Sequence, residues 1–150
     1  MRKNGFTMIE LIATISLLGI LTVLAVTSVL KYLEQAREGT YHDFEETLES
    51  SASNFLIEHT GNIPDQNESI VIDARRLICD GYLKNLKDPR NQDLTCNDDS
   101  YVVIERKNDV SYNMDLTYHV CLSCSHYKSE ACTTISTAGL PRLSASSDCS

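Results

Sequence analysis

Six cysteines are the residues in this 150-residue chain whose type and spacing most directly suggest chemistry. An even number of cysteines beyond a membrane segment predicts an oxidising, extracytoplasmic setting and a framework of disulfides, which would stabilise a domain too small for a large core. Six cysteines allow fifteen pairings, and the sequence alone does not choose among them. All six lie in the second half of the chain: Cys79, Cys96, Cys121, Cys124, Cys132 and Cys149.

Two other chemistries compete for part of this set. Cys121 and Cys124 are separated by two residues and are followed by His126 and Cys132, which together are ligand types of a tetrahedral zinc site. The pair Cys121 and Cys124 could also be redox-active, although such pairs normally lie at a helix N-terminus and Cys121 falls in an expected strand. No second Cys-x-x-Cys motif and no acid–base pair accompanies them. We therefore expect no catalytic residues, no metal and no cofactor, and keep a membrane-anchored zinc or thiol-redox protein as the alternative.

Glu10 also calls for a chemical explanation, because it lies at the edge of a nearly pure apolar run. Residues 11–30 carry no charge and include twelve Leu, Ile or Val. As a helix they would span about 30 Å, the thickness of the hydrocarbon core of a bilayer. Their summed preference for insertion, about −5 kcal/mol, outweighs the cost of a charge at mid-helix, about 2.5 to 3.5 kcal/mol. Insertion is expected, and the carboxylate needs a partner.

Arg2 and Lys3 precede the apolar run, so the positive-inside tendency predicts a single-pass protein with a cytoplasmic N-terminus. A cleaved secretory signal would have a shorter apolar region followed by a small-residue cleavage site. Here the run continues without a break into a charged, helical-looking segment. We therefore expect the apolar helix to be retained as an anchor.

The stretch KNGFTMIEL resembles the processing site of type IV prepilins and of the pseudopilins of type II secretion and competence systems. The shared pattern is a short basic leader ending in Gly, then Phe, then Glu four residues after the Phe, then an apolar helix. Gly5, Phe6 and Glu10 match it here. The resemblance implies that a prepilin peptidase cuts between Gly5 and Phe6 and methylates the new amine. Thr27 stands where many family members have Pro, so a break in the helix is less expected there.

The resemblance further implies a non-enzymatic subunit of a filament, alone or mixed with other pilins. Its helix would be both the membrane anchor and the polymerisation element. Glu10 would pair with the Phe6 amine of a neighbouring copy, or of its own chain one helical turn away, which removes most of the cost of burying either charge. The implied partners are the peptidase, a cytoplasmic assembly ATPase and a platform protein.

The implied location is the bacterial cytoplasmic membrane, followed by a cell-surface or extracellular filament. Adhesion or motility, secretion and DNA uptake all use the same N-terminal segment, so the sequence does not separate them. A net charge of −8 without a basic stripe disfavours direct contact with nucleic acid.

The expected fold class is α+β and pilin-like, with the long helix packed on a small antiparallel sheet in a head that carries disulfides. Four segments follow from this expectation. They are a leader at 1–5, a transmembrane and polymerisation helix at 6–30, an amphipathic continuation at 31–60, and an extracytoplasmic head with a tail at 65–150.

Apolar residues after the membrane run recur at helical spacing and predict a stripe that packs against the head. The stripe contains Leu33, Ala36, Phe44, Leu48, Ala52, Phe55 and Leu56. Gly39 is a weak point in this helix, and Gly61 with Pro64 marks its end.

The head is expected to contain strands at 68–73, 101–106 and 110–122, the last with an apolar residue at every second position. A helical turn or two would follow the first strand, and the tail after Cys132 would be a loop. The residues Gly-Tyr-Leu at 81–83 and Asp-Pro at 88–89 are similar to a segment of pseudopilins and Gram-positive pilins.

Overall fold

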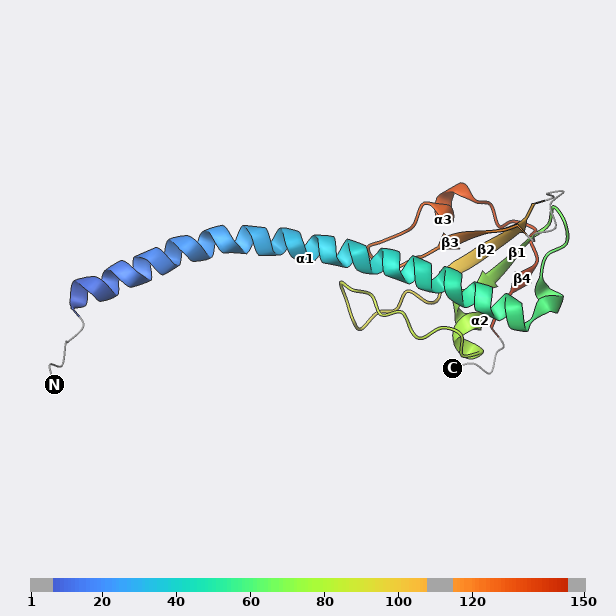
Figure 1. Ribbon diagram of the computed structural model, residues 1–150, viewed down its shortest axis with the longest axis horizontal. Coiled ribbons are helices and arrows are strands. Elements are labelled where there is room, and N and C mark those ends of the chain that lie inside the picture. Colours follow the sequence, from blue (N-terminus) through green and yellow to red (C-terminus); the bar gives the residue numbers. More distant parts are fainter. Residues whose placement is uncertain (1–6, 108–114, 146–150) are drawn as a thin grey trace. The chain divides into compact units, whose positions relative to one another are not determined.

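The computed structural model describes residues 7–107 and 115–145. The chain divides into two compact units, Met1–Glu38 and Gly39–Ser150, which are considered separately below. The elements in chain order are α1 (Met8–Glu58), the 3-10 turn η1 (Thr60–Asn62), β1 (Ser69–Asp73), α2 (Ala74–Cys79), β2 (Tyr101–Arg106), β3 (Leu116–Cys121), α3 (Ala131–Thr134) and β4 (Arg142–Leu143), as Figure 1 shows.

The helix α1 runs from Met8 to Glu58 without interruption. Gly39 does not break it, and a Cβ atom added there would meet only open space. The cost of a glycine in a helix interior, about 1 kcal/mol relative to alanine, is therefore tolerated within a long and otherwise favourable helix.

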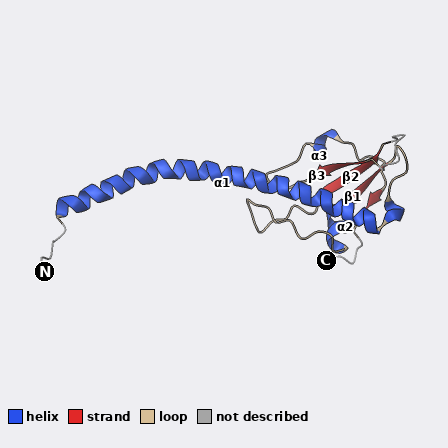
Figure 2. Cartoon of the chain, viewed as in Figure 1, coloured by secondary structure: helices blue, strands red, loops and turns tan. Residues whose placement is uncertain are grey.

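The four strands form one sheet in the order β3-β2-β1-β4. β1 pairs with β2 and β2 with β3, both antiparallel, with Val103 opposite Val71 on one side and His119 on the other. The tail, expected to be a loop, instead adds β4 parallel to β1, with Arg142 opposite Val71. The sheet is therefore mixed rather than purely antiparallel, and Figure 2 shows its strands beside α1. The α+β pilin-like class is confirmed.

Short contacts attach the last strand to the rest of the sheet. Arg142 donates to Asp73 Oδ1 from Nε at 2.7 Å, and its Nη2 lies 2.6 Å from the same oxygen. The guanidinium also lies 5.3 Å from the centre of the Tyr101 ring. The hydrogen bond that Arg142 donates to Asp73 raises the pKa of Arg142, and burial opposes this shift. Two ladder pairs alone would be a weak strand, so these side-chain contacts explain why a tail that reads as a loop joins the sheet.

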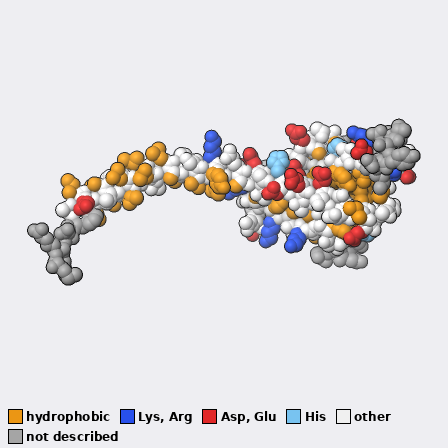
Figure 3. All heavy atoms as spheres, in the orientation of Figure 1, with side chains coloured by type: hydrophobic (Ala, Val, Ile, Leu, Met, Phe, Trp, Pro, Cys, Tyr) orange, Lys and Arg blue, Asp and Glu red, His pale blue; other side chains and the backbone are white. Residues whose placement is uncertain are grey.

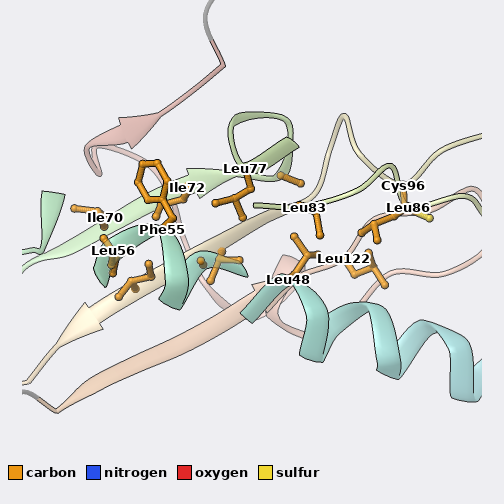
Figure 4. Close-up of a cluster of buried hydrophobic side chains, with 14 of the residues drawn as sticks. Leu48, Phe55, Leu56, Ile70, Ile72, Leu77, Leu83, Leu86, Cys96 and Leu122 are labelled. Atoms are coloured by element: carbon orange, nitrogen blue, oxygen red, sulfur yellow. The ribbon is translucent and has the colours of Figure 1, made fainter. Parts of the chain in front are cut away.

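The core of the head lies between the second half of α1 and the sheet. Leu48, Phe55 and Leu56 are at most 2% exposed. Figure 4 shows Phe55 and Leu56 near Ile70 and Ile72 of β1, and Leu48 near Leu83 and Leu122. Spacings of seven and eight residues place these helix positions on one face, and burying each such side chain favours folding by about 1.5 to 3 kcal/mol.

The stripe differs from its expected extent at one end. Tyr41, which the pattern did not include, is its first buried member, whereas Leu33 is 45% exposed and Ala36 is exposed as well. The strand expected at 110–122 is described from Leu116 to Cys121, and residues 110–114 lie outside the described part of the chain.

Candidate functional site

Glu10 lies in the first turn of α1, and its side chain is exposed. Thr7 Oγ1 donates a hydrogen bond of 3.4 Å to Glu10 Oε2, and the backbone N–H of Glu10 donates to the carbonyl of Thr7 at 3.1 Å. A carboxylate in the first turn is favoured by the helix dipole. One long hydrogen bond leaves most of the acceptor capacity of an ionised carboxylate unused by the described residues. Gly5 and Phe6 lie outside those residues, so their roles remain predictions.

The first 23 residues of α1 present apolar side chains to the outside. The large ones between Met8 and Leu30 are 50–83% exposed, and Figure 3 shows hydrophobic side chains along this segment. A helix that is apolar all round is stable only in lipid or among other helices. Among the described residues, α1 is the one helix that by length and composition could cross a membrane.

Four of the five hydroxyl side chains within this segment are satisfied inside the helix. Thr14, Ser16, Thr22 and Thr27 each donate to a backbone carbonyl three or four residues earlier, at 2.7–3.1 Å. Each bond removes a donor that would otherwise be unpaired in hydrocarbon, where an unsatisfied polar group costs several kcal/mol. The four residues therefore do not oppose insertion, and their small size allows another helix to approach closely.

The cysteines pair across the head. Cys96 is bonded to Cys124, and Cys121 is bonded to Cys132. Cys121 and Cys124 therefore have different partners and do not form a disulfide with each other, which argues against the redox interpretation of the Cys-x-x-Cys motif. Sulfurs held in disulfides are not thiolates and do not bind zinc.

The two cysteines outside these pairs add no free thiol among the described residues. Cys79 is also disulfide-bonded, and Cys149 lies outside the described residues. Within residues 7–107 and 115–145, no group of three His, Cys, Asp or Glu side chains is placed to hold a metal ion. His126, the fourth candidate ligand of the zinc interpretation, is exposed.

Replacing both Cys96 and Cys124 with Ser should destabilise the head by about 3 to 4 kcal/mol, because that disulfide closes a loop with a sequence separation of 28. The same change at Cys121 and Cys132, with a separation of 11, should cost about 3 kcal/mol. Urea unfolding of the full chain in detergent micelles, followed by tyrosine near-UV circular dichroism, measures both. A loss below about 1 kcal/mol for either pair would show that the bond does not constrain the unfolded head.

A buried carboxylate connects three segments of the head. Asp88 is fully buried, and its Oδ1 accepts hydrogen bonds from Tyr41 Oη at 2.9 Å and from the backbone N–H of Arg90 at 2.8 Å. Its Oδ2 accepts from the backbone N–H of Ser125 at 3.1 Å and from the Ser125 hydroxyl. Burial raises the pKa of Asp88, but the hydrogen bonds from Ser125, Arg90 and Tyr41 outweigh it and lower the pKa to about 2. The carboxylate of Asp88 thus joins three segments through hydrogen bonds: α1, its own loop after α2, and the disulfide-bonded loop.

This cluster was not predicted from the sequence. Its one visible signal was the Asp-Pro pair at 88–89, whose similarity to a pilin segment gave no role to the carboxylate. Tyr41 also stacks on Tyr127, with ring centres 4.3 Å apart, so the start of the buried stripe is held on two sides.

The N-terminal segment matches a known family model. The model is described as the prokaryotic N-terminal methylation motif, and it matches residues 1–26. This is the signature of type IV pilins and pseudopilins, so the recognition based on Gly5, Phe6 and Glu10 is confirmed at the level of the motif. Neither curated proteins nor solved structures match the chain.

These findings support a precursor of the type IV pilin or pseudopilin kind. Proteins with this signature are generally structural rather than enzymatic, and they are processed by a peptidase and assembled into polymers. The apolar helix and the motif together fit anchoring in a membrane.

Proposed function

We propose that this chain is a structural subunit of a type IV pilus-like filament. A prepilin peptidase would remove residues 1–5 and methylate the amine of Phe6. Residues 6–30 then serve first as a membrane anchor and later as the polymerisation helix, 31–60 continue that helix, and 65–150 form the extracytoplasmic head. The assembly ATPase and platform protein extract the subunit from the cytoplasmic membrane into a surface or extracellular filament.

The observation that carries this proposal is the exposure of the apolar side chains between Met8 and Leu30 in a chain with the methylation motif. This surface has two environments that suit it, lipid before assembly and the helices of other copies afterwards. Moving the helix from lipid into a bundle of other copies costs little free energy, because hydrocarbon and packed Leu, Ile and Val side chains are similarly apolar.

Glu10 fixes the axial register of each subunit relative to its neighbours in the filament. Processing creates a cationic amine at Phe6, four residues before the carboxylate. Within a bundle of helices the effective dielectric is low, so the amine of one copy and Glu10 of another attract strongly. A copy that enters at the wrong height leaves two charges buried without partners, which costs about 3 to 5 kcal/mol.

The mass of the intact mature protein tests the processing step. We expect the native product to lack residues 1–5 and to carry one added methyl group. Gly5→Val should prevent both cleavage and methylation, because the peptidase would no longer recognise the residue that precedes the cut. Retention of residues 1–5 in the wild-type product, or processing of the Val variant at the normal position, would contradict the proposal.

A further inference from the structure

We propose that a groove in the head receives a basic loop of a neighbouring copy, so that two different surfaces of the head bind each other in the filament. The acidic groove lies between α1 and β3 with the loop that follows it, and has a volume of about 740 Å³. Glu45, Glu46 and Glu49 line it on the helix side, and Tyr118 and Val120 line it on the sheet side. The inference rests on the proposed function, since it concerns contacts within the same polymer.

The acidic groove keeps negative charge that its own residues do not neutralise. Glu45 accepts a hydrogen bond of 2.8 Å from the Tyr127 hydroxyl and lies 3.3 Å from a ring nitrogen of His42. Glu46 and Glu49 are exposed and form no ion pair with any described residue. Lys128 is the single lysine or arginine among the lining residues of the described chain.

The basic loop, residues 84–90, carries the complementary charge. Lys84 and Lys87 are exposed and form no ion pair within the described part of the chain. The carboxylate of Asp88, directly after Lys87, is buried in the head, where four hydrogen bonds hold it. The surface of this loop therefore presents lysine side chains, while its one acidic residue is buried.

The groove and the start of the segment that leads into the basic loop contact different flanks of α1. On the groove side, Glu45 bonds to Tyr127; on the other side, Ser51 Oγ donates to the carbonyl of Tyr82 at 3.0 Å, directly before the basic loop. Six residues separate Glu45 and Ser51, which is about 120° around a helix. Figure 1 shows the segment between α2 and β2 on one side of α1 and the loop with α3 on the other.

Two different surfaces of one molecule that bind each other make a heterologous contact. Such a contact does not close on itself in a pair, so it leads to an open helical polymer rather than a dimer. Exposed ion pairs are weak, so the apolar helices supply most of the affinity between copies. The charges determine how one head is rotated relative to the next, because an orientation that brings like charges together is disfavoured. Each copy has a net charge of −8, which opposes close packing of copies, so a contact between opposite charges offsets part of this repulsion.

Cross-linking of the full chain in native filaments tests the contact directly. A chain with Glu49→Cys and Lys87→Cys should form, under mild oxidation, disulfide-linked dimers, trimers and larger species on non-reducing gels. Each single-cysteine variant should remain mostly monomeric, because the contact brings position 49 of one copy to position 87 of the next and never joins identical positions. The matched control carries Glu68→Cys in place of Glu49→Cys, together with Lys87→Cys. Glu68 is exposed and does not line the groove, so this chain should also remain monomeric.

Charge reversal provides a second measurement. Glu49→Lys should lower the assembled fraction about tenfold, because it places lysine against lysine. Combining it with Lys87→Glu should restore assembly to within about twofold of wild type. Glu68→Lys, which changes the net charge equally outside both surfaces, should leave assembly unchanged.

The outcomes separate this inference from the proposed function. If the wild-type chain forms filaments but the paired cysteines give no ladder and Glu49→Lys assembles normally, the groove contact is wrong and the filament function stands. If the wild-type chain forms no polymer under any assembly condition, the proposed function fails and the contact fails with it.

Discussion

A chain with Glu10→Ala is expected to enter the membrane normally and to form no filaments. Insertion should not suffer, because removing a carboxylate from the edge of the apolar run lowers the cost of entering lipid. Assembly should fail because the amine of Phe6 in a neighbouring copy would be buried without its partner. Breaking a buried pair on one side costs about 3 to 5 kcal/mol, which corresponds to a decrease of more than a hundredfold in the affinity of each incoming subunit.

Three further variants separate the charge of Glu10 from its local hydrogen bond. Glu10→Gln keeps the shape and loses the charge, so it should fail as the alanine variant does. Glu10→Asp keeps the charge on a shorter side chain and should assemble poorly rather than not at all. Thr7→Val removes the hydroxyl that donates to Glu10 at 3.4 Å and should assemble normally.

The measurement is the yield of sheared or pelleted filaments together with the amount of each variant in the membrane fraction. Wild-type yield from Glu10→Gln would show that the negative charge has no role in assembly. Failure of Thr7→Val to the same degree as Glu10→Ala would assign Glu10 a local role in starting the helix instead.

The parts of the fold that the sequence predicted are those with strong local periodicity. The helix expected at 6–30 with its continuation at 31–60 is described from Met8 to Glu58, and the strands expected at 68–73 and 101–106 are β1 and β2. In each case the apolar residues repeat at the spacing of the element and are bounded by turn residues. Local pattern and tertiary packing agree there, so the pattern suffices.

Other features depend on contacts between residues distant in the sequence, and no local pattern contains them. The pairing of Cys96 with Cys124 is one of many that the spacing allows. β4 has only two residues and is held by Arg142 through Asp73 and Tyr101, neither of which is near it in sequence. Asp88 looks like a solvated loop residue until the donors from α1 and the disulfide-bonded loop are placed around it.

The candidate site shows the same division. The motif at Gly5, Phe6 and Glu10 is a local signal, and the family model recovers it. The acidic groove and the basic loop are surfaces of the folded head, which no local pattern in the sequence contains. The N-terminal motif thus predicts that copies assemble, whereas the surfaces that orient one head on the next depend on the folded head.

Replacing Asp88 with Asn should destabilise the head by about 3 to 5 kcal/mol at neutral pH. The carboxylate accepts hydrogen bonds from Tyr41, Arg90 and Ser125, including two from Ser125, and donors would face the amide nitrogen of Asn at one of its two oxygen positions. Tyr41→Phe is the matched control, since it removes one donor and leaves the others; it should cost about 2 kcal/mol. Thermal unfolding of the full chain in detergent micelles, followed by tyrosine near-UV circular dichroism, compares the variants.

The pH dependence of this difference identifies the charge as its cause. The pKa of Asp88 is lowered from its ordinary value of 3.8 to about 2 in the folded head. A depressed folded pKa stabilises the protein fully above the unfolded pKa, and this contribution is lost as the pH falls through the folded pKa. The stability gap between wild type and Asp88→Asn should therefore be constant above about pH 4 and shrink between about pH 4 and 2. A gap that stays constant to pH 2 would show that the shape of the side chain, not its ionisation, holds the three segments together.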